Sequence, residues 1–94
     1  MTGSKPPSRA QKASWRSPSR GAPGVAAALV RLGNRVRSLR CERGLTQEES
    51  AHRATLDAKH LQAIEAGRVN ATVASLVGIA RSLGVSLAAL FEDV

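Results

Sequence analysis

The sequence predicts an all-α fold, a compact five-helix bundle over residues 25–94 that is preceded by a disordered basic arm over residues 1–24. Two observations favour the bundle. After residue 25, apolar residues recur at intervals of three and four, which places them on one face of a helix. Glycines and N-capping residues separate these apolar segments. A third observation excludes a sheet, because no run of alternating β-branched residues is bounded by turns.

Length and charge limit what the chain can be. Its 94 residues have room for one small domain. The 14 Lys+Arg and 7 Asp+Glu give a net charge of +7, which favours an anionic partner. The single cysteine permits no disulfide within the chain and is typical of a reducing compartment. No apolar run approaches the roughly 20 residues that span a bilayer, so we expect a cytoplasmic protein with no membrane contact.

The arm over residues 1–24 carries five basic residues and no acid, so its charge is +5 and that of the remainder is +2. It is rich in Pro, Ser and Gly, and Trp15 is its only large apolar side chain. Such a segment buries too little surface to offset its ordering entropy, which predicts disorder. Two interpretations stay open, an arm that follows DNA phosphates or enters a minor groove, and a solvated leader without a partner.

The first helix is expected to begin between Val25 and Leu32 and to end at Arg43. Its apolar stripe consists of residues spaced by three and four, namely Val25, Leu29, Leu32, Val36 and Leu39. Gly33 weakens the early turns, because glycine is a poor helix former. Cys41 is expected to be a small buried hydrophobe.

Two short helices joined by a tight turn form the centre of the chain. Thr46 and Glu49 have the spacing of a capping box, so a helix starts directly after Thr46. Asp57 is the next N-cap, and the second helix spans residues 58–66. Gly67 ends it, because glycine readily takes the positive φ that follows a last helical turn.

The last two helices are predicted by the same signals. Thr72 is an N-cap and Gly84 a stop, and the apolar residues between them are Val73, Leu76, Val77, Ile79, Ala80 and Leu83. Ser86 caps a final short helix that ends near Phe91.

Three segments carry a family resemblance: L-T-Q-E-E at 45–49, I-E-A-G-R-V-N at 64–70 and I-A-R-S-L-G-V-S-L-A-A-L-F at 79–91. In this order and spacing they resemble the helix-turn-helix proteins of phage Cro and repressors, the Cro/C1-type or XRE family. The resemblance covers about residues 32–91. It implies a lambda repressor-like bundle with its motif at residues 46–67, bound as a homodimer to double-stranded DNA.

The resemblance also implies that the second motif helix enters the major groove. Its inward side would hold Leu61, Ile64 and Glu65. The outward side, expected to contact bases, comprises Ala58, Lys59, His60, Gln62 and Ala63. Lys donates to guanine O6 and N7, Gln pairs with adenine in two hydrogen bonds, and Ala methyl groups contact the thymine methyl.

Other roles are assigned to residues around this helix. Phosphate contacts are expected at helix ends and in the loop after Gly67, namely Gln47, Arg35, Arg43, Arg53, Arg68 and Asn70. For each arginine the competing interpretation is a solvated surface residue. The resemblance implies an ion pair between Arg40 and Glu65. It also implies a dimer face on the last helix at Leu87, Leu90 and Phe91, although the same three residues suit a core.

Two residues depart from the family pattern within the motif. Ser50 stands where leucine is usual, which gives up roughly 1.5–3 kcal/mol of burial, and its hydroxyl is expected to bond to the carbonyl of Thr46. Thr55 stands where glycine is frequent, and a β-branched residue resists positive φ.

Two other classes of function were compared with DNA binding. An enzyme is not expected, nor a metal or cofactor, because His52 and His60 have no carboxylate or cysteine spaced to complete a site. The alternative is a protein-binding helix-turn-helix module, antitoxin-like or co-activator-bridging, with only non-specific affinity for nucleic acid. The basic tail and the two departures favour that module, whereas the polar, methyl-bearing outer face of helix 58–66 favours sequence-specific DNA binding.

Overall fold

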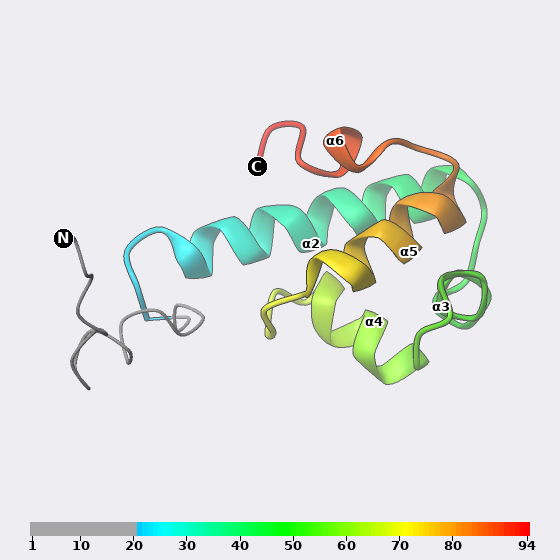
Figure 1. The fold of residues 1–94 in the computed structure, drawn as a ribbon, viewed down its shortest axis with the longest axis horizontal. Coiled ribbons are helices and arrows are strands. Elements are labelled where there is room, and N and C mark those ends of the chain that lie inside the picture. Colours follow the sequence, from blue (N-terminus) through cyan, green and yellow to red (C-terminus); the bar gives the residue numbers. More distant parts are fainter. Residues whose placement is uncertain (1–20) are drawn as a thin grey trace, which may run out of the picture.

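The computed structural model describes residues 21–94, which form a bundle of five helices (Figure 1). These are α2 (Val25–Glu42), α3 (Gln47–Ala54), α4 (Ala58–Glu65), α5 (Val73–Leu83) and α6 (Leu87–Leu90). No strand occurs within residues 21–94. The predicted all-α five-helix fold is therefore confirmed for this part of the chain. Residues 1–20, which make up most of the predicted basic arm (residues 1–24), lie outside the described residues.

Side-chain caps set the starts of the four later helices, as the sequence predicts. Thr46, Asp57, Thr72 and Ser86 each accept a hydrogen bond from a backbone N–H of the helix that follows. At Thr46 the capping box is complete, because Glu49 N–H donates to Thr46 Oγ1 at 3.0 Å and Thr46 N–H donates to Glu49 Oε1 at 2.8 Å. These bonds satisfy backbone groups that a helix start leaves unpaired.

The helices pack around α2, the longest of them. It contacts α4, α5 and α6, while α3 packs against α4 and α5 (Figure 1). The centre of the core consists of side chains with almost no exposed surface, namely Val36, Leu61, Ile79, Leu83 and Leu90. On the predicted stripe of α2, Val36 and its neighbours Leu32 and Leu39 are buried, whereas Val25 and Leu29 are half-buried.

Two glycines allow helices to approach unusually closely. A Cβ on Gly33 would lie 2.5 Å from the carbonyl oxygens of both Ile64 and Glu65, and a Cβ on Gly78 would lie 2.7 Å from that of Ala54. Gly33 therefore does more than weaken a helix: it lets α2 touch the backbone at the end of α4. Gly78 does the same for α5 and α3.

Two sequence predictions about polar groups are wrong. Cys41 is exposed, because it lies two residues beyond the buried Leu39 and off the core face of α2. Ser50 is fully buried, and its hydroxyl lies 3.3 Å from that of Ser82 and not on the carbonyl of Thr46. Ser82 donates its own proton to the Ile79 carbonyl at 2.7 Å, so Ser50 is the donor of the pair.

Thr55 ends α3 with φ 59° and ψ 42°, in the left-handed region. A β-branched side chain is disfavoured in this region by contacts between Cβ and the backbone. The motif turn therefore contains local backbone strain, in the place where the family often has glycine.

Replacing Thr55 by glycine should stabilise the protein by about 1 kcal/mol, because the strain of left-handed backbone costs roughly 1–2 kcal/mol in a residue with a Cβ. For a domain of this size the thermal midpoint should rise by roughly 4–8 °C. Gly84→Ala is the matched control with the opposite sign, since Gly84 has φ +69° and its Cβ would meet nothing within 4 Å. A lower midpoint for Thr55→Gly would show that the threonine side chain makes contacts that outweigh the strain.

Candidate nucleic-acid interface

The outer face of α4 is the surface that the sequence assigns to DNA. Leu61, Ile64 and Glu65 are buried against the bundle, as expected. On the opposite side Lys59 and Gln62 are exposed. The remaining predicted base-contact residues, Ala58, His60 and Ala63, are half-buried at the edges of this face. The helix thus presents two long polar side chains flanked by an imidazole and two methyl groups.

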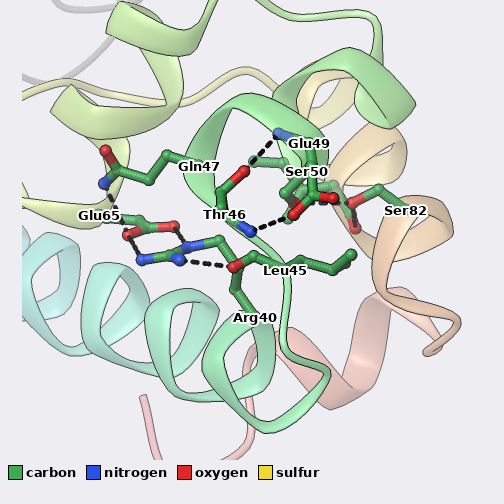
Figure 2. A network of polar contacts seen from close by, with 9 residues as sticks. Arg40, Leu45, Thr46, Gln47, Glu49, Ser50, Glu65 and Ser82 are labelled. Carbon is green, nitrogen blue, oxygen red and sulfur yellow. Dashed lines mark hydrogen bonds and ion pairs between the residues drawn. The ribbon is translucent and has the colours of Figure 1, made fainter.

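A buried polar network fixes the inner face of α4 (Figure 2). Arg40 donates to Glu65 through Nε at 2.7 Å and through Nη2 at 3.0 Å, and its Nη1 donates to the Leu45 carbonyl at 2.8 Å. Gln47 donates its amide to the same carboxylate at 3.0 Å. The side chains of Glu65 and Arg40 are only 3% and 11% exposed. One carboxylate therefore joins α2, the start of α3 and the end of α4.

This network leaves no buried charge without a partner. The two-bond contact of a guanidinium with a carboxylate is the strongest common form of charge-assisted hydrogen bond. The hydrogen bond to Glu65 raises the pKa of the Arg40 guanidinium above its already high ordinary value. The pair implied by the family resemblance is thus present. No local pattern in the sequence indicates that Gln47 also bonds to Glu65.

An open hollow of about 570 Å³ runs beside this network, between α2, α3 and α4. Its lining includes both glutamines of the motif, two arginines of α2 and two glutamates, and in full it comprises Arg37, Arg40, Thr46, Gln47, Glu48, Gln62, Glu65 and Ala66. Arg37 was not among the predicted contact residues. Its position off the apolar stripe of α2 was the available signal, but sequence alone does not show which way such a residue faces.

The predicted phosphate-contact residues lie on different parts of the surface. Arg35 joins α2 to the C-terminal segment, because its Nε donates to the Ala89 carbonyl at 2.9 Å and its Nη2 pairs with Glu92 at 3.0 Å. Its phosphate contact stays a prediction. Gln47 lies beside α4, and Arg68 and Asn70 follow α4 in the exposed loop. The two remaining arginines, Arg43 and Arg53, are exposed and line a different hollow.

The three residues of the proposed dimer face differ in how far they are buried. Leu90 has no exposed surface and belongs to the core, which corrects its assignment to an interface. Leu87 is half-buried and packs against that core. Phe91 is 44% exposed, and Val73 and Val77 on α5 are 67% and 41% exposed. Phe91 is therefore the most exposed of the three candidates.

Comparison with known proteins identifies the family. The Helix-turn-helix family model matches residues 36–90, more than half of the chain. The chain belongs to the helix-turn-helix family. The control protein C.MunI of Mycoplasma sp. is 36% identical over 66 residues, which cover 69% of this chain and 89% of that protein. The resemblance to the Cro/C1 group that the motifs carry is thereby confirmed.

Solved structures of controller proteins share the fold of this helix-turn-helix chain. C.AhdI from Aeromonas hydrophila, a restriction-modification controller protein, is 34% identical with a TM-score of 0.68, and the match covers 69% of this chain and 98% of that one. The controller protein C.Esp1396I, solved as a tetramer in complex with its natural 35 base-pair operator, is 33% identical with a TM-score of 0.65, over 70% and 87% of the two chains.

Two further findings apply to residues 21–94. None of the helices there is long and apolar enough to cross a membrane. In the same part of the chain, no three His, Cys, Asp or Glu side chains are grouped closely enough to hold a metal ion.

Replacing Glu65 by alanine should lower the free energy of unfolding by about 3 kcal/mol or more, because the Arg40 charge would remain largely buried without its partner. Urea unfolding followed by circular dichroism measures the change. Glu42→Ala is the control, since this exposed carboxylate should matter by less than about 0.5 kcal/mol. An unchanged urea midpoint for Glu65→Ala would contradict a structural role for the pair.

Proposed function

We propose that this chain is a sequence-specific DNA-binding regulator of transcription that reads the major groove with the outer face of α4. The observation that carries the proposal is the exposed pair Lys59 and Gln62 on a helix whose opposite face is locked by the buried Arg40–Glu65 pair. When the buried face of a helix is held in place by packing and hydrogen bonds, the side chains on its exposed face have fixed positions for hydrogen bonding. The family match, and the operator complex of the similar controller C.Esp1396I, support the same function.

Each group on the outer face has a base partner in this proposal. Lys59 donates to guanine, Gln62 pairs with adenine, and the methyl groups of Ala58 and Ala63 meet thymine methyl groups. His60 stands at the edge of this set. Gln47 keeps a second amide hydrogen beyond the one bonded to Glu65, which suits a phosphate contact. Arg68 and Asn70 contact the adjacent backbone and set the register.

Further features belong to the proposal. A homodimer places two α4 helices in half-sites about one helical turn, roughly 34 Å, apart. The basic residues 1–24 add non-specific attraction to phosphates. The protein acts in the cytoplasm and catalyses no reaction. Repression and activation both fit this arrangement, because they differ in where the operator lies relative to the promoter.

The function is tested by selecting bound sequences from a random duplex pool at two salt concentrations. The wild type is compared with a variant whose five basic residues in the arm are replaced by glutamine. Both proteins should enrich the same palindrome, and the arm variant should show a shallower dependence of affinity on salt. Recovery of no motif, with binding that vanishes at moderate salt, would reject sequence-specific binding and favour a helix-turn-helix module that binds a protein partner.

The base contacts give a sharper prediction. Lys59→Ala and Gln62→Ala should each change the ranking of operator variants, with a loss of about 1–3 kcal/mol on the preferred base at one position. Competition binding against single-base variants of the selected duplex measures this. Arg68→Ala is the control, because loss of a phosphate contact should weaken all duplexes alike. Rankings that stay the same in both α4 variants would show that other residues read the bases.

The dimer is tested at Phe91. Replacing it by alanine should leave the protein folded, since its side chain is 44% exposed, but should weaken self-association. Sedimentation velocity over a concentration series measures the association, and circular dichroism checks the fold. Leu90→Ala is the contrasting variant, because loss of a fully buried leucine should cost about 2–5 kcal/mol of stability. Unchanged association of Phe91→Ala would place the interface elsewhere.

A further inference from the structure

Three arginines at the ends of three helices line one open hollow of about 500 Å³. Arg43 is the residue after α2, Arg53 lies in the last turn of α3, and Arg81 lies in the last turn of α5. Leu45, Ser82, Leu83 and Gly84 complete the lining. We propose that this arginine hollow, defined by Arg43, Arg53 and Arg81, is a binding site for a phosphate group.

The lining of the hollow carries three arginines and no acidic residue. Within residues 21–94 the ion pairs join Arg35 to Glu92 and Arg40 to Glu65, so none involves an arginine of the hollow. Glu49, one turn before Arg53 and outside the lining, interacts electrostatically with Arg53 and offsets part of its charge, while its Oε1 accepts a hydrogen bond from the Thr46 N–H. A bound anion would supply the negative charge that this lining lacks.

Helix dipoles account for only part of this arrangement. A basic residue near the end of a helix is favoured by the partial negative charge there, and Arg43 does bond to its own helix, through Nη1 to the Leu39 carbonyl at 3.3 Å. That effect explains one arginine on each helix. It does not explain why the three side chains meet around a single hollow that lacks a carboxylate.

The chemistry of the lining selects the class of ligand. A guanidinium offers five N–H donors in a planar fork that matches two oxygens of a phosphate. Leu45 and Leu83 contribute apolar surface to the lining, so the arginines supply its hydrogen-bond donors. Ser82 is not a ligand in this proposal, because its proton is donated to the Ile79 carbonyl.

The arginine hollow is separate from the proposed base-reading surface. It shares no lining residue with the hollow beside Gln47 and Gln62. Arg43 and Arg53 were predicted as single phosphate contacts, whereas Arg81 was not among the predicted DNA contacts. The phosphate therefore has two possible sources, the backbone of a bound duplex beyond the contacts of α4, or a free phosphate or nucleotide. The site goes beyond the proposed function, because phosphate binding here requires no reading of sequence.

The test is an NMR titration of full-length protein with inorganic phosphate, observed at the arginine Nε–Hε signals. Sodium chloride at equal ionic strength is the reference. Saturable shifts of the Arg43, Arg53 and Arg81 signals are expected, and Arg81→Gln should weaken the affinity several-fold. Arg31→Gln is the matched control, because exposed Arg31 lines another hollow that also contains Glu92 and Asp93, and it should titrate like the wild type. Circular dichroism confirms that each variant is folded, and Arg53→Gln serves as a second variant from another helix.

Shifts that chloride reproduces, or titrations of Arg81→Gln and Arg53→Gln that match the wild type, would overturn the proposal. A second experiment, on duplex binding, identifies the source of the phosphate group. If it is a DNA backbone, the slope of log affinity against log salt for duplex binding should fall by about 0.9 in Arg81→Gln and stay constant in Arg31→Gln. If the slope is unchanged while phosphate affinity is lost, the ligand is a free phosphate group. Saturable phosphate binding in a protein that selects no operator would reject the proposed function and leave this site standing.

Discussion

The carboxylate of Glu65 is the point on which the arrangement of this domain depends. It is almost fully buried, and it receives two hydrogen bonds from Arg40 and one from Gln47 (Figure 2). A buried charge is tolerated only when its partners are complete. Because those partners come from α2 and from the first residue of α3, the end of α4 can occupy only one position relative to both helices.

Backbone geometry adds a second constraint on α4. Gly33 lets α2 contact the carbonyl groups at the end of the helix, and a side chain there would force the two helices apart. At the start of the turn that precedes α4, Thr55 adopts a left-handed conformation that suits glycine better. The strain is kept because the network and the close helix contact determine where α4 must lie. Together they leave Lys59 and Gln62 facing outward.

Most of the fold could be predicted from the sequence because its signals are local. The N-caps Thr46, Asp57, Thr72 and Ser86 act on backbone groups two or three residues away, so spacing alone identifies them. Helix ends were predicted within one residue: α2 ends at Glu42 and α4 at Glu65. The ion pair between Arg40 and Glu65 followed only from the family resemblance, since its partners are 25 residues apart.

The failures concern contacts between distant segments. Nothing near Arg35 in the sequence indicates that it bonds to Ala89 and Glu92. Ser50 bonds to Ser82 on another helix, and Leu90 lies at the centre of the core although it belongs to the last helical turn. Arg43 and Arg53 were predicted as separate phosphate contacts, but the sequence does not indicate that they share a hollow with Arg81, because the three come together only in the folded protein.

The most direct test of the central claim, that the locked α4 presents the DNA-reading surface, is an amide and methyl NMR map of the protein bound to its selected duplex. The account predicts the largest shift changes at Ala58, Lys59, Gln62 and Ala63, with smaller changes at Gln47 and in residues 68–70. Largest changes on α5 and α6, with α4 unaltered, would contradict it and indicate that the domain binds its partner through another face.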